Sequence, residues 1–316
     1  MSEIHTAPDQ QPDKPPKRRA VWIAVAAVLA LGVFLGGFAL GAARTASPAS
    51  AAGTNSPDAT PAGKPGSART VDEIKSSGTV RIGVFSDKAP FGYVDANGAY
   101  AGYDIVYGDR IAKDLGVKVE YVPVEAASRV EFLETGKVDI ILANFTVTPE
   151  RAEKVDFAKP YLKVALGVVS PAKGLISKES ELAGKKVIVV KGTTAETYLE
   201  ANHPELDLVK FEQYTEATSA LTDGRADAWV TDNTEALAWS LSNDGFTTGI
   251  TSLGPTDTIA GAVQKGNSSL RAWLNEQLVT LGTEKFFHAD FTQTLKPVYG
   301  DAASPDELVV EGGVVS

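Results

Sequence analysis

The chain has no cysteine among its 316 residues, which excludes disulfide bonds, thiolate metal sites and cysteine nucleophiles together. The same absence excludes the lipid-modified cysteine that anchors many exported proteins. Only three histidines occur, His5, His203 and His288, and their wide separation leads us to expect no metal site. No Walker loop, G-x-S-x-G motif or metal-spaced cluster occurs either. We therefore expect no cofactor and no catalytic apparatus.

Negative charge is concentrated in the main part of the chain. Residues 1–69 hold seven Lys and Arg against four Asp and Glu, which leaves 23 against 36 for the remainder. An acidic body argues against nucleic acid as a partner, because neutralising phosphates requires a basic face.

The N-terminal part predicts a membrane anchor. Residues 1–19 are rich in Pro, Asp and Lys and predict a disordered tail. Residues 20–43 carry no charge over 24 positions, enough to cross a hydrocarbon core of roughly 30 Å. Four basic residues precede this run and put the tail in the cytoplasm, so everything after Arg44 is expected outside. Residues 44–69 predict a flexible linker. The alternative is a signal sequence cleaved near residue 51, which would normally have a shorter apolar region.

From residue 70 onward, short β-rich runs alternate with helical stretches, which predicts an α/β fold with mainly parallel strands. The predicted strands are 79–85, 118–123, 138–143, 163–169, 186–190, 226–230 and 258–263. The predicted helices are 102–115, 129–135, 195–201, 216–223, 234–241 and 267–283.

The first candidate binding pattern is N-F-T-V-T-P-E-R at Asn144–Arg151, directly after an apolar strand. Ligands bind at the carboxyl ends of strands in open α/β sheets. The planar fork of an arginine suits a carboxylate. Thr148 and Pro149 also fit a helix N-cap and first turn, and both interpretations hold together because the cap places Arg151 at the cleft.

Two further patterns follow other strands. Lys191–Thr194 (K-G-T-T) lies at a strand-to-helix turn, where amides and hydroxyls attract an anion. Asp232 ends the apolar run in A-D-A-W-V-T-D-N and either pairs with an ammonium or caps the next helix. Together the three patterns provide two sites for a carboxylate and one for an ammonium, which is the set that an α-amino acid requires.

An ordered series of motifs carries a family resemblance. They are D-K-A-P-F-G-Y (Asp87–Tyr93), G-Y-D (Gly102–Asp104), T-P-E-R (Thr148–Arg151), V-D-F-A-K-P-Y (Val155–Tyr161), K-G-T-T and Asp232. With them, residues 70–300 resemble the polar amino-acid class of periplasmic-type substrate-binding proteins of ABC importers. The resemblance implies two Rossmann-like α/β lobes joined by two crossover strands, the type 2 periplasmic binding protein fold. Lobe 1 is expected at 70–163 and 256–300, lobe 2 at 164–255 and a C-terminal tail at 301–316. The implied partners are a small polar amino acid and an ABC permease with its ATPase subunits.

Carried over by motif, the resemblance implies that Arg151 binds the ligand's α-carboxylate, helped by Thr146 and by the amide and hydroxyl of Thr194. It implies that Asp232 binds the α-ammonium, with the carbonyl of Asn144 as a second acceptor. The remaining implied or candidate site residues are Phe85, Lys88, Ala126, Arg129, Thr193 and Tyr214.

The side-chain pocket is expected to reject cationic ligands. Many relatives stack an aromatic ring on the ligand where Ala126 stands here, and without it a cationic side chain loses its platform. Arg129 and Lys88 are expected to repel a cation further. The segment Glu125–Leu133 is most similar to cysteine-binding members, whereas the glutamate-binding branch shares an arginine at position 129. The ligand stays open among cysteine, cystine, glutamate and glutamine.

Two other functional classes compete with an importer component. A dehydratase-like enzyme of the same fold would need a positioned acid or base in the cleft, and only Asp232 and arginines are expected there. A sensor ectodomain would need a second span or an output domain, and no such segment follows residue 300.

Overall fold

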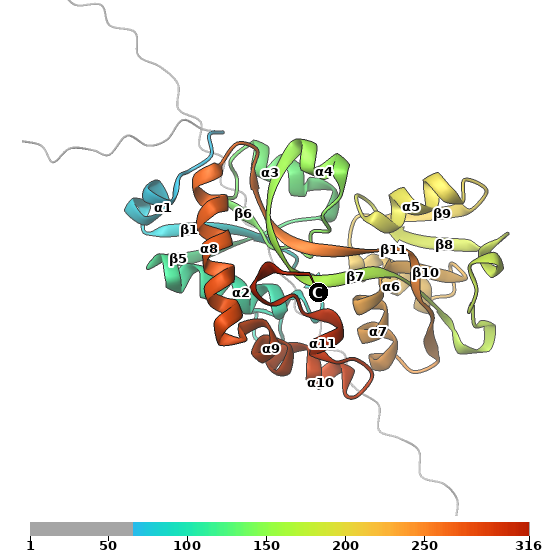
Figure 1. The fold of residues 1–316 in the computed structure, drawn as a ribbon. Coiled ribbons are helices and arrows are strands. Elements are labelled where there is room, and N and C mark those ends of the chain that lie inside the picture. The colour runs from blue at the N-terminus through green and yellow to red at the C-terminus, as the bar shows by residue number, and fades with distance from the viewer. Residues whose placement is uncertain (1–65, 316) are drawn as a thin grey trace, which may run out of the picture. The chain divides into compact units, whose positions relative to one another are not determined.

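The structure, a computed structural model, describes residues 66–315 (Figure 1). The predicted tail and anchor, and the predicted linker up to residue 65, lie outside the described residues. Within the described part, no helix combines the length and the apolar character that crossing a membrane requires.

Eight strands form one mixed sheet in the order β5-β1-β6-β11-β7-β10-β8-β9. Three short strands, β2, β3 and β4, form a second, antiparallel sheet. The strands are β1 (Thr79–Val84), β2 (Asp87–Lys88), β3 (Gly92–Val94), β4 (Tyr100–Ala101), β5 (Lys118–Pro123), β6 (Ile140–Ile141), β7 (Val155–Pro171), β8 (Lys186–Val190), β9 (Asp207–Phe211), β10 (Ala228–Asp232) and β11 (Phe246–Gln264).

Helices cover the sheets and connect most of the parallel strands. They are α1 (Val71–Ser77), α2 (Tyr103–Leu115), α3 (Arg129–Glu134), α4 (Pro149–Lys154), α5 (Thr194–Asn202), α6 (Tyr214–Thr222), α7 (Asn233–Ser242), α8 (Ser268–Glu284), α9 (Phe286–Asp290), α10 (Lys296–Tyr299) and α11 (Pro305–Leu308).

Two long antiparallel strands, β7 and β11, run through both lobes, as the resemblance implied. Their pairing begins with Val155 opposite Gln264 beside β6 and ends with Pro171 opposite Phe246 beyond β10. The expected lobe boundaries, 163/164 and 255/256, fall inside these two strands. The expectation of an α/β fold with two lobes and two crossover strands is confirmed.

Alternating side chains along β8 explain how the second lobe is layered. Val187 and Val189 share a core cluster with Leu199 of α5, whereas Ile188 and Val190 share another with Leu221 of α6. Successive strand residues point to opposite faces, so an unbroken apolar strand needs a helix on each side. Figure 1 shows α5 on one side of β8 and α6 on the other.

The C-terminal segment requires a correction, because residues 301–315 do not form a tail. Val310 is 1% exposed and its amide donates to the carbonyl of Tyr161 at 3.0 Å. Glu311 accepts a hydrogen bond from the amide of His288 at 2.8 Å. Burial of Val309 and Val310 against the first lobe explains why this segment is ordered.

Candidate functional site

The residues singled out from the sequence gather between the lobes. From the first lobe come Phe85, Lys88, Ala126, Arg129, Asn144, Thr146 and Arg151, and from the second come Thr193, Thr194, Tyr214 and Asp232. The two lobes meet at Gly192 of the second lobe. Its carbonyl accepts hydrogen bonds from Arg129 Nη2 at 3.0 Å and Arg151 Nη2 at 2.9 Å. Gly192 has φ 74°, and a side chain there would collide with the backbone of Ala127. The lobes are therefore closed on one another at this point.

Arg151 is placed by the cap that the sequence predicted. Thr148 is the N-cap of α4 and accepts a hydrogen bond from the Arg151 amide at 3.3 Å, with Pro149 in the first turn. The guanidinium donates to the carbonyls of Thr146 (2.8 Å) and Gly192. These two bonds leave three of its five N–H groups without a hydrogen-bond partner among residues 66–315.

Arg129 makes more hydrogen bonds to the protein than Arg151 does. It is 3% exposed, and it donates to the carbonyls of Ala126 and Ala143, each at 2.9 Å, to Asn144 at 3.4 Å and to Gly192. Phe145 lies beside both guanidinium groups, with its ring centroid 4.3 Å from Arg129 Cζ and 4.9 Å from Arg151 Cζ.

Neither guanidinium forms an ion pair with a carboxylate in the part of the chain that the structure describes. No ion pair within residues 66–315 includes Arg129 or Arg151, although each of the five other arginines of this region forms one. Burial, and then the neighbouring Arg129 charge, lower the pKa of Arg151 to about 9. Arg129 is buried and Arg151 is partly buried, and Asp232 and Asp257 act on Arg151 only from beyond ion-pair distance. Two such positive charges favour the binding of an anion beside them.

The opposite charge lies on the other side of the site. Asp232 ends β10, and its Oδ2 accepts hydrogen bonds from Lys88 Nζ at 2.8 Å and Asn144 Nδ2 at 2.9 Å. Lys88 also pairs with Glu235 at 2.9 Å. The expectation that Lys88 adds net positive charge to the pocket is therefore wrong, because two carboxylates surround its ammonium.

Asn144 is held in an unusual conformation. Its φ of 45° is left-handed, and its amide donates to Asp104 Oδ2 at 2.9 Å while Tyr161 donates to Asp104 Oδ1 at 2.6 Å. Burial raises the pKa of Asp104 to about 7. The side-chain carbonyl Oδ1 of Asn144 is buried and has no hydrogen-bond partner among the described residues. A buried unsatisfied acceptor next to a carboxylate suits an ammonium donor.

The two threonines of K-G-T-T differ in whether their side chains are already used within the second lobe. The Thr193 hydroxyl donates to the Val190 carbonyl at 2.7 Å and caps α5 by accepting from the Glu196 amide at 3.3 Å, so its hydroxyl is occupied within the second lobe. Thr194 instead lines a cavity of about 570 Å³ together with Arg151, Gly192 and other residues.

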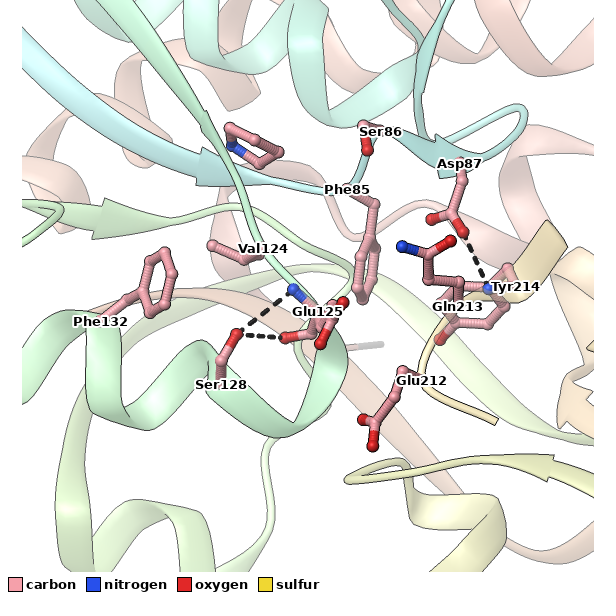
Figure 2. A pocket seen from close by; sticks show the side chains of 11 residues that line it. Phe85, Ser86, Asp87, Val124, Glu125, Ser128, Phe132, Glu212, Gln213 and Tyr214 are labelled. Atoms are coloured by element: carbon pink, nitrogen blue, oxygen red, sulfur yellow. Dashed lines mark hydrogen bonds between the residues drawn. The ribbon is translucent and has the colours of Figure 1, made fainter. Parts of the chain in front are cut away.

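A second cavity, of about 440 Å³, shares no lining residue with the first (Figure 2). Phe85, Asp87 and Glu125 of the first lobe and Glu212 and Tyr214 of the second are among its lining residues. The rings of Phe85 and Tyr214 meet edge to face, with centroids 5.2 Å apart. Ala126 is 4% exposed and adds no ring to this arrangement.

Four residues of the site were not identified as site residues from the sequence: Asp87, Asp104, Phe145 and Glu235. Asp87 and Asp104 stand inside motifs quoted for the resemblance. Glu235 lies three residues after Asp232, at the spacing of helix neighbours, which is the signal that would have found it.

Comparisons with known proteins agree with this architecture. Residues 80–288 match the family described as bacterial extracellular solute-binding proteins, family 3. The ABC transporter glutamine-binding protein GlnH of Bacillus subtilis is 30% identical over 233 residues, which cover 72% of this chain and 85% of that protein.

Two solved structures are similar at 50% sequence identity and a TM-score of 0.75. The solute receptor for L-cysteine of Neisseria gonorrhoeae is matched over 77% of this chain and 100% of that chain. The cysteine-binding protein from Campylobacter jejuni is matched over 76% and 98%. The family match, the two-lobe fold with its paired crossover strands and the charged site between the lobes agree: the chain belongs to the bacterial extracellular solute-binding proteins of family 3.

Proposed function

We propose that this chain is the extracytoplasmic substrate-binding component of an ABC amino-acid importer and that it binds L-cysteine between its lobes. The observation that carries the proposal is a pair of arginines, Arg129 buried and Arg151 partly buried, that form no ion pair within residues 66–315 and lie across from an acid and an unsatisfied carbonyl. A ligand that brings a carboxylate and an ammonium on one carbon complements both sides at once.

Each group of the ligand has a protein partner in this proposal. Arg151 binds the α-carboxylate with its free N–H groups, helped by Thr146 and Thr194. The α-ammonium lies between the Asn144 carbonyl and Asp232 Oδ1, the carboxylate oxygen that accepts neither the Lys88 nor the Asn144 hydrogen bond. Phe85, Ala126, Arg129 and Tyr214 enclose the side chain.

The bonding of Arg129 favours cysteine over glutamate. Four hydrogen bonds to backbone carbonyls occupy most of its donors, so little capacity remains for a second carboxylate. The 50% identity to two cysteine-binding structures supports the same choice, and the relationship to a glutamine-binding protein makes glutamine the next ligand to test.

A thermal-shift screen of the purified chain against all twenty amino acids and cystine tests the proposal, with cysteine kept reduced. A ligand at one hundred times its Kd adds roughly 2.7 kcal/mol to the free energy of unfolding. We expect the largest rise in Tm with cysteine. An absence of any shift across the whole set would contradict amino-acid binding, and a larger shift with glutamine would reassign the ligand.

Glu235 is the residue that would support the alternative function, an enzyme of the same fold. Burial raises the pKa of Glu235 to about 7, which suits a general acid or base. Its Oε2, however, is bound by the Thr231 hydroxyl at 2.6 Å and by Lys88, and the residue is 3% exposed. Mass spectrometry of amino acids incubated with the chain separates the two functions, because only an enzyme would produce a new compound.

A further inference from the structure

Lys88 reaches from the first lobe into an acidic recess of the second lobe, formed by Tyr214, Asp232 and Glu235. Its Nζ lies 2.8 Å from Asp232 Oδ2, 2.9 Å from Glu235 Oε2 and 3.0 Å from the Tyr214 hydroxyl. The three N–H donors of the ammonium therefore have three acceptors. Nζ also lies 4.2 Å from the centroid of the Tyr214 ring, where a cation is attracted to the π face.

The acidic recess needs a cation in the closed structure. Asp232 is 8% exposed and Glu235 is 3% exposed, and burial, together with the neighbouring charge of Asp232, raises the pKa of Glu235. Among residues 66–315, Lys88 is the ion-pair partner of both, and neither pairs with any other base of that region. Without Lys88 two carboxylates would be enclosed with no counterion, which is a costly arrangement.

The recess is continuous with the proposed ligand site, because Asp232 belongs to both. Phe85 and Tyr214, which flank the Lys88 ammonium at 5.7 Å and 4.2 Å, also line the 440 Å³ cavity shown in Figure 2. Tyr214 belongs to both that cavity and the recess, so we expect loss of the Lys88 alkyl chain to open space beside this ring. A guanidinium or ammonium carried on a ligand's side chain would then meet two carboxylates, a hydroxyl and an aromatic face.

We propose that Lys88 is a built-in occupant of a subsite for cationic side chains, and that it excludes arginine and lysine by filling a recess that would otherwise accept them. The inference rests on the proposed function, since it requires an amino acid to bind between the lobes. Selectivity against cations then comes from occupancy of the recess and not from a pocket of net positive charge.

The test is a gain of binding in the Lys88→Ala variant of the full chain, measured by calorimetry with arginine, lysine and citrulline. Citrulline matches arginine in shape but has no charge. We expect Lys88→Ala to bind arginine at least about ten-fold more tightly than the wild type does. Its affinity for citrulline should rise little. Adding Glu235→Gln to Lys88→Ala should remove most of the gain. Lys88→Met, which keeps the recess filled without a charge, should gain less than Lys88→Ala.

Two outcomes would overturn the inference: an unchanged response to arginine in Lys88→Ala, or equal gains for arginine and citrulline. A variant of low stability still reports a ligand, because arginine that binds the native state raises its Tm. Failure here is distinct from failure of the proposed function. If the wild type binds cysteine but Lys88→Ala does not bind arginine more tightly, only the role of Lys88 is contradicted. If the wild type binds no amino acid, the proposed function itself is contradicted.

Discussion

Asp87 of the first lobe caps helix α6 of the second lobe through the backbone of Tyr214. Its Oδ2 accepts hydrogen bonds from the amides of Tyr214 at 2.8 Å and Thr215 at 3.3 Å. The helix has no cap of its own, since the side chain of Gln213 at the N-cap position makes no capping hydrogen bond. Closure of the two lobes therefore satisfies amides that the open form would leave to water.

We expect Asp87→Ala to weaken cysteine binding by about 0.5–2 kcal/mol, the usual contribution of a helix cap. The loss should come mainly from faster release, because the contact exists only in the closed form. Stopped-flow or surface-based kinetics measure the two rates separately. Asp244→Ala, an exposed acid of the second lobe, is the control. An unchanged release rate in Asp87→Ala would rule out a role of this cap in closure.

Arg151→Ala should abolish ligand-induced stabilisation while the unliganded fold stays intact. The loss of a charge-assisted pair to a carboxylate costs on the order of 2–5 kcal/mol of binding. Calorimetry gives the affinity, and Arg225→Ala, which removes a surface arginine of the second lobe, is the matched control. Wild-type affinity in Arg151→Ala would show that another group binds the carboxylate.

Asp232→Asn should weaken cysteine far more than 3-mercaptopropionate, which lacks the ammonium. A charged acceptor offsets the burial of an ammonium, and a neutral amide does not. Competition binding of the two ligands to wild type and variant measures the difference. Equal losses for both would reduce Asp232 to a partner of Lys88 with no contact to the ligand.

Arg129→Met should lower the affinities for cysteine and glutamate by similar factors. The variant loses the bond to the Gly192 carbonyl that joins the lobes, and this contact serves any ligand. A competition assay of the two amino acids on both proteins provides the comparison. A selective loss of glutamate binding would indicate that Arg129 pairs with a side-chain carboxylate, and would favour glutamate as the ligand.

We expect Asp290 to make the stability of the first lobe depend on pH. Burial raises the pKa of Asp290 from 3.8 to about 9, and its Oδ2 is buried with no hydrogen-bond partner among the described residues. The folded chain therefore retains a proton that the unfolded chain releases near 3.8. The associated stability is complete at low pH and is lost as the pH rises from about 4 towards 9.

Asp290→Asn should flatten that part of the stability curve, because the amide has nearly the same shape and no proton to lose. Urea unfolding at a series of pH values within this range measures the slope. Asp244→Asn supplies the comparison with an exposed acid. A slope identical to that of the wild type in Asp290→Asn would assign the pH dependence to other groups.

Local patterns predicted much of the fold. The strand at Lys186–Val190 and the N-cap at Thr148 were predicted to the residue, because apolar runs and caps depend on neighbours a few positions away. The run 138–143 pairs only at Ile140–Ile141, and β9 was missed, since pairing depends on distant strands. The full lengths of β7 and β11 were also missed, because they arise from pairing with one another across both lobes.

The sequence alone determined which groups stand at the ends of strands and the starts of helices, and so which charges face the space between the lobes. Only the tertiary structure decided which of those charges are already used. Lys88 and Asp232 are 144 positions apart, and their pairing exists because the lobes close and enclose both groups away from water. Arg151 keeps more free donors than Arg129, since each count depends on which carbonyls the fold brings within reach. Such pairings depend on burial and distance, and neither quantity is encoded in the order of neighbouring residues.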